Sequence, residues 1–365
     1  MAACPAAGLP VVRPARFEDY EGIAAVQQAN GLTPKSREEW EHLWAGNPAL
    51  HSLADWPIGW VLEDGAAGIV GSIGNLPFLW HLGDKVLVCA SGHGWSVRPA
   101  YRGYSLLLLR RYLGQPGVDL LITTSPSAAV AALFEKMGWS RVPAGRWDRA
   151  ALWITGYRAL ARELAAAAHA RALNRGRTEL RFERDAPPPV SAAGRDLCWR
   201  ETFDSSFDAF WTELRARHPR LLWSARNRAT LEWHFRFGLA AGRVRILTAL
   251  KGSRLAAYAI FRLRLAANGV RVASVADLQM LEPNPALCRA LMANAARYCR
   301  MQGIALIENA GCCLESEAYL DRSAPYHRST GTWLYLYKAA SASLEADLRD
   351  ARRWQPTQFD GDAML

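Results

Sequence analysis

The hydrophobic pattern is clearest within the N-terminal half, where it changes in the order strand, turn, helix, strand, helix. An extended run predicts a strand over 86–97, and a segment with Pro and Gly predicts a turn over 98–104. An apolar helix begins at Ser105, a short buried strand follows at 120–124, and a second helix begins near Ser127. The order of these elements predicts parallel strands joined through a helix.

The turn of this unit has a chemical consequence. It lies at the carboxyl end of a strand and at the amino end of a helix, where backbone N–H groups lack helical partners and the helix dipole is positive. The pattern therefore indicates a place where a phosphate or pyrophosphate group can bind.

The residues before this unit predict two helices and several antiparallel strands. Turn residues at Asp64-Gly65 and Gly83-Asp84 indicate two hairpins. The predicted segments are a strand at Val11–Arg13, helices from Tyr20 and at Arg37–Trp44, and strands at Trp60–Glu63, Ile69–Gly74, Phe78–Leu82 and Val86–Cys89.

The C-terminal half repeats the order strand, turn, helix, strand more weakly. Its predicted elements are helices at Phe207–Arg217, Ala229–Phe237 and Ala286–Met301, and strands at Arg243–Leu250, Arg254–Arg264, Val270–Leu281 and Ile304–Glu308. An Ala-rich helix over 156–175, a strand at Glu179–Glu183 and the Pro187–Pro189 tract separate the two halves. We expect domains at 11–155 and 196–340, a connection at 156–195 and a C-terminal tail at 341–365.

Composition narrows the class of protein. The chain has 365 residues and a net charge of +10, and most of its basic side chains are arginine. No basic run with interleaved aromatic residues indicates a nucleic-acid-binding face. The seven cysteines show no C-x-x-C pair and no metal-ligand spacing, so we expect reduced thiols and no metal site. With no evident signal peptide and no apolar segment of membrane-spanning length, we expect a cytoplasmic protein.

Two motifs within residues 11–155 resemble the GCN5-related N-acetyltransferase (GNAT) superfamily. The family's V-x-P-x-x-R-G turn appears with Val97, Arg102 and Gly103, and an A-x-x-F-E-K-x-G-W signature ends the later helix at Trp139. The two signatures occur in the family's order, about thirty residues apart, which makes the pair more specific than either motif alone. The segment RNRATLEWHFRF at Arg226–Phe237 is similar to the entry of the second half of tandem GNAT proteins.

This resemblance implies a mixed α/β (α+β) fold with two GNAT-like domains in tandem, the second degenerate. It implies acetyl-CoA or another acyl-CoA as donor and an amine-bearing small molecule or sugar as acceptor. The residues implied to bind the donor are Val97, Arg102, Gly103, Tyr104, Ser105 and Leu106. The Val97 backbone N–H would polarise the thioester carbonyl, and Arg102 to Leu106 would hold the pyrophosphate.

The sequence departs from the family at three positions. Ser105 and Leu107 occupy sites where the family has small residues that let the phosphates approach the backbone, so Leu107 is expected to crowd this site. Phe134 replaces the Tyr that usually acts as general acid, so a hydroxyl to protonate the departing thiolate is absent there.

His93 is the candidate general base, because it lies on the strand before the turn and an unperturbed His titrates near neutral pH. A His packed beside Trp95 for structural reasons is the alternative. Glu63 and Asp64 are weaker candidates of the same kind, and Asp277 and Glu308 are candidates for an acceptor site shared between the domains. One residue of the cluster Thr123, Thr124, Ser125 and Ser127 is expected to cap the following helix.

The favoured function is an acyl-CoA-dependent N-acyltransferase. Two alternatives stay open. An aminoacyl-tRNA-dependent transferase of the peptidoglycan-bridge type would suit the positive charge, and a CoA-binding or scaffolding protein without catalysis would suit the three departures.

Overall fold

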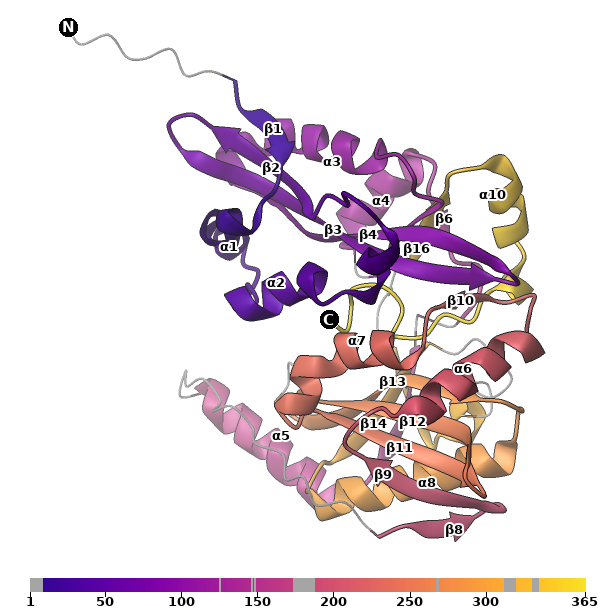
Figure 1. Cartoon of the computed structure of the whole chain (residues 1–365). Helices are drawn as coiled ribbons and strands as arrows, with labels where there is room; N and C mark the ends of the chain where they lie inside the picture. The colour runs from indigo at the N-terminus through magenta and orange to yellow at the C-terminus, as the bar shows by residue number, and fades with distance from the viewer. Residues whose placement is uncertain are drawn as a thin grey trace, which may run out of the picture.

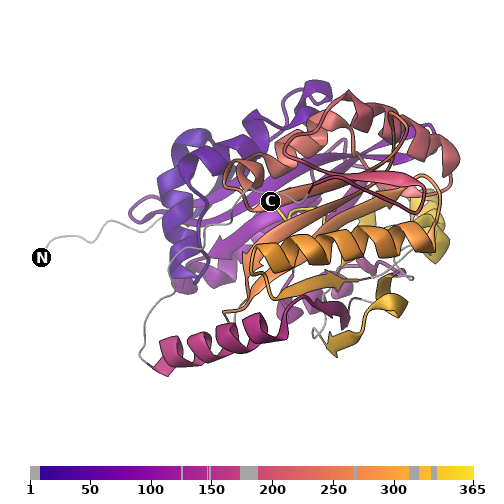
Figure 2. The same ribbon diagram turned by 90° about the horizontal axis from the view of Figure 1, so that it is seen from below.

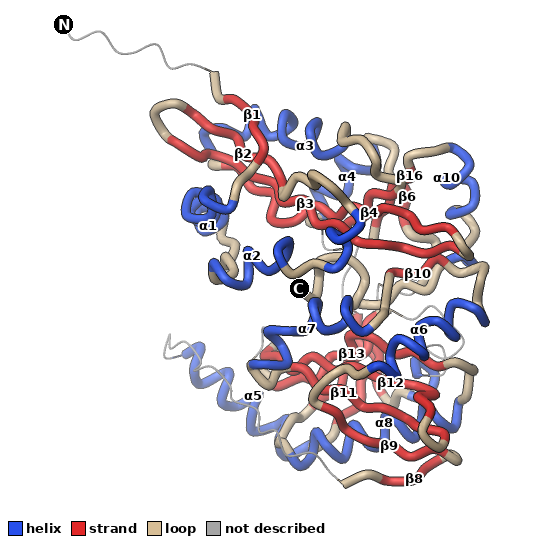
Figure 3. The backbone as a smooth tube through the Cα atoms, in the orientation of Figure 1, coloured by secondary structure: helices blue, strands red, loops and turns tan. Residues whose placement is uncertain are grey.

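Two mixed β-sheets lie one above the other in a computed structural model of the chain (Figures 1 and 3). The structure describes residues 9–124, 126–145, 147, 149–172, 188–266, 269–311, 320–329 and 335–365. Several predictions fall outside these residues, namely the strand at Glu179–Glu183, Pro187, the capping candidate Ser125 and the cysteines Cys4, Cys312 and Cys313. The expected fold class, mixed α/β with a sheet in each half, is confirmed.

The first sheet has eight strands in the order β1-β2-β3-β4-β5-β16-β6, and β10 also pairs with β3. Its strands are β1 (Val11–Pro14), β2 (Gly59–Asp64), β3 (Gly68–Leu82), β4 (Lys85–Val97), β5 (Leu120–Thr123), β6 (Ser140–Arg141), β10 (Leu222–Ser224) and β16 (Leu336–Ala339). Only the β4–β5 pair of this described sheet is parallel. The helix between those two strands makes the predicted strand, turn, helix, strand unit.

The helices of the first half lie on both faces of this sheet (Figure 1). They are α1 (Tyr20–Ala29), α2 (Arg37–Ala45), α3 (Ser105–Leu113), α4 (Ala128–Lys136) and the short turns η1 (Phe17–Asp19), η2 (Pro48–Ser52) and η3 (Pro99–Tyr104). Ser36 caps α2 and Ser127 caps α4, each accepting a hydrogen bond from a backbone N–H of the first turn. The prediction that one residue of the polar cluster caps the second helix is therefore confirmed.

The second sheet has the order β15-β7-β14-β13-β12-β11-β9-β8. Its strands are β7 (Arg149–Ile154), β8 (Val190–Ala192), β9 (Arg195–Arg200), β11 (Val244–Lys251), β12 (Arg254–Leu265), β13 (Arg271–Met280), β14 (Leu306–Ala310) and β15 (Tyr326–Ser329). The helices of this half are α5 (Tyr157–Ala172), α6 (Ser205–Arg217), α7 (Arg228–Ala240), α8 (Pro285–Met301), α10 (Ala342–Leu348) and the turn η4 (Ala351–Arg353). Helices α6 and α7 lie on the side facing the first sheet, and α8 crosses the opposite face (Figures 1 and 2).

Strand exchange between the halves corrects the predicted domain boundaries. The strand β7, placed in the first domain by a boundary at residue 155, pairs with β14 and β15 of the second sheet. The strand β16, placed in the second domain by a boundary at residue 340, pairs with β5 and β6 of the first. Each sheet is therefore completed by a strand from the other half of the chain, a long-range pairing that local patterning does not reveal.

One predicted hairpin boundary is wrong. Ile69–Gly74 and Phe78–Leu82 form the single strand β3, which continues through Pro77. The N–H of Asn75 donates to Ile58 on the β2 side, so position 77, two residues on, faces the same side. On that edge no described strand pairs with β3 at position 77, since the β2 pairing ends at Gly74 and the β10 pairing begins at Trp80; β4 pairs with Pro77 on the other edge. Proline therefore removes no ladder hydrogen bond.

The residues expected to form a C-terminal tail are packed into the molecule. Trp354 is almost fully buried, with its ring 6.3 Å from that of Trp80 and its indole N–H bonded to the carbonyl of Leu348. The following residues from Gln355 to Asp360 run between the two sheets, where the C-terminus lies in Figure 1. Among the described residues, no helix combines the length and the apolar character that crossing a membrane requires.

Candidate active site

A cavity opens where the two parallel strands of the first sheet separate. The strands β4 and β5 pair from Cys89–Leu120 to Ser91–Ile122, after which β4 continues to Val97 while β5 ends. The cavity has a volume of about 720 Å³ and is lined by both separated strand ends, by the α3 and α4 amino ends, and by the segment before α2. It is therefore bordered by every element of the predicted phosphate-binding unit.

A β-bulge shapes the β4 wall of the cavity. Between its pairings with Gly74 and Ser72, β4 carries one extra residue, because His93 and Ser96 are the register partners. Gly94 lies in this bulge at φ 59°, and a Cβ there would come within 2.5 Å of the Gln27 amide nitrogen. A side chain at position 94 would thus be strained and would clash, which explains why glycine is found here.

The α3 end of the cavity, where the resemblance implies donor binding, carries three of the residues predicted from it. Val97, Arg102 and Ser105 line it, and Gly103 and Tyr104 complete the turn between them. The Arg98 N–H donates to Val70, so the Val97 N–H faces the opposite edge, where β5 no longer pairs. No side chain caps α3, in contrast to α2 and α4; η3 leads directly into it, with the Ser105 N–H donating to the Arg102 carbonyl oxygen. The positive end of the α3 dipole therefore lies at this turn and favours an anion there.

The structure corrects the expectation that Leu107 crowds this end. Leu107 lines a separate surface hollow together with Val12, Arg110 and Arg111, and it is absent from the lining of the main cavity. Leu106 is more than half exposed. A Cβ at Gly103 would meet no atom within 4 Å, so the turn leaves open space for a bound group.

Three stacked aromatic rings form one wall. The Phe134 ring is parallel to both neighbours, with centroid distances of 6.2 Å to Trp95 and 4.6 Å to Trp139. Phe134 lines the cavity at the position where the family resemblance leads one to expect a tyrosine. The wall is therefore apolar at the point where a hydroxyl would otherwise be available.

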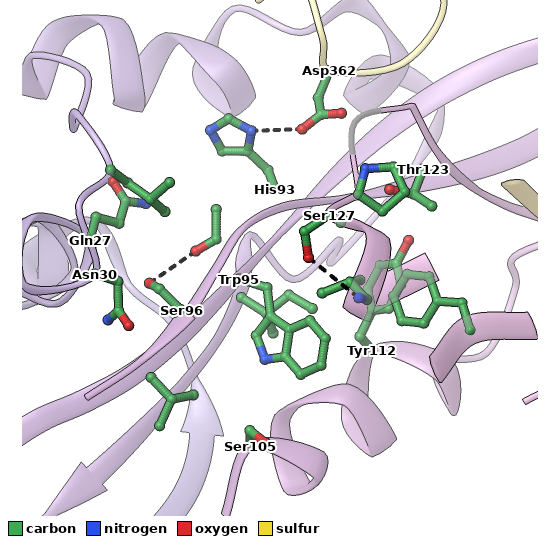
Figure 4. A pocket seen from close by; sticks show the side chains of 18 of the residues that line it. Gln27, Asn30, His93, Trp95, Ser96, Ser105, Tyr112, Thr123, Ser127 and Asp362 are labelled. Atoms are coloured by element: carbon green, nitrogen blue, oxygen red, sulfur yellow. Dashed lines mark hydrogen bonds and ion pairs between the residues drawn. The ribbon is translucent and has the colours of Figure 1, made fainter. Parts of the chain in front are cut away.

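His93 lines the middle of the cavity and is paired with a carboxylate. Its Nδ1 lies 3.1 Å from Oδ2 of Asp362, and the other carboxylate oxygen accepts a hydrogen bond from the Thr124 hydroxyl at 3.2 Å. Figure 4 shows this pair, with Gln27 and Asn30 to one side of it. Because a carboxylate accepts from Nδ1–H, Nε2 is the nitrogen free to take a proton. His93 is thus a polar site residue and not only a packed ring.

Asp362 is a candidate site residue that the sequence analysis did not identify. It follows Gly361, which has φ 77° and lies so close to Thr124 that a Cβ would come within 2.7 Å. The C-terminal segment therefore passes directly over the end of β5. The only signal in the sequence is an Asp within a glycine-containing terminal segment, which does not by itself indicate a partner for His93.

A buried ion-pair network holds this segment in place. Arg226, about 2% exposed, donates to Asp277 at 3.0 Å and to Asp360 at 3.1 Å. It also donates to Thr357, and the Tyr258 hydroxyl donates to Asp277. Burial, opposed by the Arg226 charge, raises the pKa of Asp360 to about 6. The network anchors residues 357–360 to the second sheet just before Asp362 enters the first.

The remaining carboxylates singled out from the sequence are structural. Asp277 belongs to the buried network, and Glu308 pairs with Arg264 and with a second arginine, so the predicted shared acceptor role does not fit either. Glu63 pairs with Arg13, and Asp64 accepts hydrogen bonds from the turn N–H groups of residues 66 and 67. None of these four lines the main cavity.

The end of the cavity beside the segment between α1 and α2 is polar; it is called the acceptor end below, after the role proposed for it. It is lined by Gln27, Asn30, Thr33 and Lys35 from the segment between α1 and α2, and by Asp362 with Ala363 from the C-terminal segment. Burial lowers the pKa of Lys35, and the Asp362 carboxylate partly opposes this effect. This end offers amide, hydroxyl and ammonium groups to a hydrophilic molecule. Among the described residues, no cluster of His, Cys, Asp and Glu could hold a metal ion.

Comparisons with known proteins identify the fold. No protein-family model matches the chain, and no curated protein matches it. A GCN5-related N-acetyltransferase from Kribbella flavida superposes with a TM-score of 0.56 at 15% identity, over 90% of this chain and 71% of that one. A GCN5-related N-acetyltransferase from Anabaena variabilis superposes with a TM-score of 0.55 at 13% identity, over 91% of this chain and 73% of that one. Saccharomyces cerevisiae N-myristoyltransferase with bound myristoyl-CoA superposes with a TM-score of 0.54 at 11% identity, over 92% of this chain and 81% of that one. The chain therefore has the GNAT fold, and its two sheets fit the expected tandem arrangement.

Proposed function

We propose that this protein is an acyl-CoA-dependent N-acyltransferase that uses acetyl-CoA and acylates an amine of a small molecule or sugar. One observation carries the proposal. A single cavity joins the uncapped amino end of α3, with Arg102 and Ser105, to the His93–Asp362 pair. Such a cavity brings an anion-binding end and a candidate general base into one space.

The donor fits the residues at the α3 end. Arg102, the Ser105 hydroxyl and the positive amino end of α3 would hold the pyrophosphate, and the Val97 N–H would face the thioester carbonyl. Bound acetyl-CoA supplies an activated acyl thioester for attack by an amine. A structurally similar protein, yeast N-myristoyltransferase, was crystallised with an acyl-CoA, which supports this class of donor.

His93 would take the proton that the attacking amine loses. Its Nε2 is the available nitrogen because Asp362 accepts from Nδ1, and Thr124 holds the carboxylate in turn. The carboxylate also stabilises the imidazolium that forms. The thiolate would be protonated by water or by a residue other than Phe134, since the aromatic wall carries no hydroxyl at that place.

The test is release of free thiol from acetyl-CoA across a panel of amines and amino sugars. Transfer above the rate of hydrolysis by the wild type, reduced about a hundredfold or more in His93→Ala with unchanged acetyl-CoA affinity, is the expected result. Binding without release for any acceptor would favour a CoA-binding protein without catalysis, a reading that the missing Phe134 hydroxyl supports. Transfer only from charged tRNA would favour an aminoacyl transferase.

A further inference from the structure

Two cations without an ion-pair partner among the described residues lie at this end of the cavity: Lys35 lines it, and Arg262 lies behind the lining residue Ala363. No acidic side chain in the described part of the chain forms an ion pair with Lys35 or Arg262. The charges of Glu39 and Asp362 both act on Lys35, but Glu39 accepts hydrogen bonds from Ser36, and Asp362 is engaged by His93 and Thr124.

Lys35 is held in this position by its neighbours. Its backbone carbonyl accepts a hydrogen bond from the Tyr20 hydroxyl at 2.7 Å, and the next residue, Ser36, caps α2 through a backbone N–H of that helix. Arg37 stacks over the Tyr20 ring at 4.8 Å. The backbone of Lys35 is therefore held in place, and its partly buried side chain lines the cavity.

Arg262 comes from the second sheet. It donates to the Ala363 carbonyl oxygen at 3.5 Å and contacts the Met364 sulfur at 3.3 Å, so it lies directly behind the segment that lines the cavity. Arg264, two residues along the same strand, is paired with Glu308. Arg264 therefore has a carboxylate partner in the second sheet, whereas the partners of Arg262 are a carbonyl oxygen and a thioether sulfur.

These cations repel one another. Burial lowers the pKa of Lys35; the Glu39 and Asp362 carboxylates oppose this effect, and the charges of Arg262 and Arg243 add to it. Burial also lowers the pKa of Arg262, and Arg243 and Arg264 add to that effect. Partly buried charge without a counter-ion is costly, and an anion bound among these groups would remove the cost.

We propose that the acceptor end binds an anionic group of the acceptor, a phosphate or a carboxylate, through Lys35, with Arg262 of the second sheet supporting the same charge from behind Ala363. This inference rests on the proposed function, because it assigns the acceptor to this end of the cavity. It gives the second half of the chain a role in choosing the acceptor. Polyamines and other polycationic amines would be rejected by like charge.

The first experiment tests the anion site without acyl transfer. Inorganic phosphate is titrated into Arg102→Glu, which removes the exposed arginine of the donor end, and thermal stabilisation is measured. We expect stabilisation in Arg102→Glu that is lost in the double variant with Lys35→Gln and retained in a double variant with Lys251→Gln, a surface lysine on the β11–β12 hairpin. No stabilisation of Arg102→Glu, or equal stabilisation in all three proteins, would overturn the proposal.

The second experiment compares matched acceptors. Glucosamine 6-phosphate and glucosamine differ by a phosphate, and γ-aminobutyrate and butylamine differ by a carboxylate. For the anion that is recognised, we expect kcat/KM of the charged member to exceed that of its neutral partner, and Lys35→Gln to reduce this ratio at least about tenfold, as loss of a charge-assisted hydrogen bond predicts. Lys35→Arg should preserve the ratio, and both variants should bind acetyl-CoA as the wild type does. A ratio unchanged in Lys35→Gln would contradict the proposal. Failure of the wild type to acylate any amine would instead count against the proposed function, and the phosphate titration would still decide the anion site.

Discussion

His93 and Asp362 are 269 positions apart in the sequence, yet Nδ1 of the one lies 3.1 Å from a carboxylate oxygen of the other. The histidine comes from the strand that carries the donor turn, and the aspartate comes from a segment anchored to the second sheet. The candidate base therefore comes from the first half of the chain, and its carboxylate partner comes from the C-terminal segment. The buried C-terminal segment is thus what brings a carboxylate to His93.

The pair predicts how substitution of Asp362 affects the rate. Asp362→Asn keeps the shape but can present an N–H to Nδ1, which favours the wrong tautomer of His93. We expect kcat to fall by roughly tenfold to a thousandfold, with the affinity for acetyl-CoA unchanged, and His93→Ala to lose at least as much. Asp347→Asn, at an exposed ion pair with Arg353, is the matched control and should retain full activity. Wild-type kcat in Asp362→Asn would remove the pair from the mechanism.

The anchoring network predicts a loss of stability. Arg226→Met leaves Asp277 and Asp360 buried without their cation, so we expect the free energy of unfolding to fall by about 3–5 kcal/mol, measured by urea denaturation. Arg228→Met, two residues later, removes only an exposed pair with Glu232 and should unfold like the wild type. Equal stability of the two variants would show that the buried network does not anchor the segment.

A buried histidine predicts acid sensitivity. Burial lowers the pKa of His234 from 6.5 to about 3, and neither ring nitrogen has a hydrogen-bond partner in the described part of the chain. Since the unfolded chain takes up the proton first, folding stability is lost as the pH falls below about 6.5. From pH 7 to pH 5 this one group should cost roughly 2 kcal/mol.

His234→Phe should remove that part of the acid loss and keep the ring contact with Phe359, whose centroid lies 4.5 Å away. The measurement is the free energy of unfolding of both proteins at pH 7 and pH 5. His81, whose pKa burial lowers to about 4, contributes equally to both and cancels in the comparison. The same acid loss in the variant as in the wild type would show that His234 is not the group responsible.

The aromatic wall predicts a gain of activity. Phe134→Tyr restores a hydroxyl at the place where the resemblance leads one to expect the general acid, so turnover in the thiol-release assay should rise. A positioned acid contributes on the order of a hundredfold to ten-thousandfold, and even a poorly aligned hydroxyl should be visible. Phe134→Leu is the control, because it alters the stack between Trp95 and Trp139 without adding a hydroxyl. Turnover that falls equally in both variants would show that activity depends on the intact stack of three rings and not on an added hydroxyl.

The local parts of this molecule could be predicted from the sequence. The donor turn with Arg102, the helix cap at Ser127 and the strands around His93 follow from short patterns, because each depends on neighbouring residues. The same patterns predicted a sheet in each half.

The long-range parts could not be predicted. The exchange of β7 and β16 between the sheets depends on pairings between segments that are far apart in sequence. The continuity of β3 through Pro77 depends on a gap between two other strands. Asp362 reaches His93 only because a buried arginine fixes the segment before it, and no local pattern shows that contact.

The measurement that tests the central claim most directly is the affinity of the wild type and Arg102→Glu for acetyl-CoA, by isothermal titration. The account predicts one site per chain in the wild type and an affinity at least about tenfold weaker in Arg102→Glu, because a cation at the pyrophosphate becomes an anion. Arg349→Glu, an exposed arginine after α10, should bind as the wild type does. No binding by the wild type, or equal binding by Arg102→Glu, would contradict the assignment of this cavity to an acyl-CoA donor.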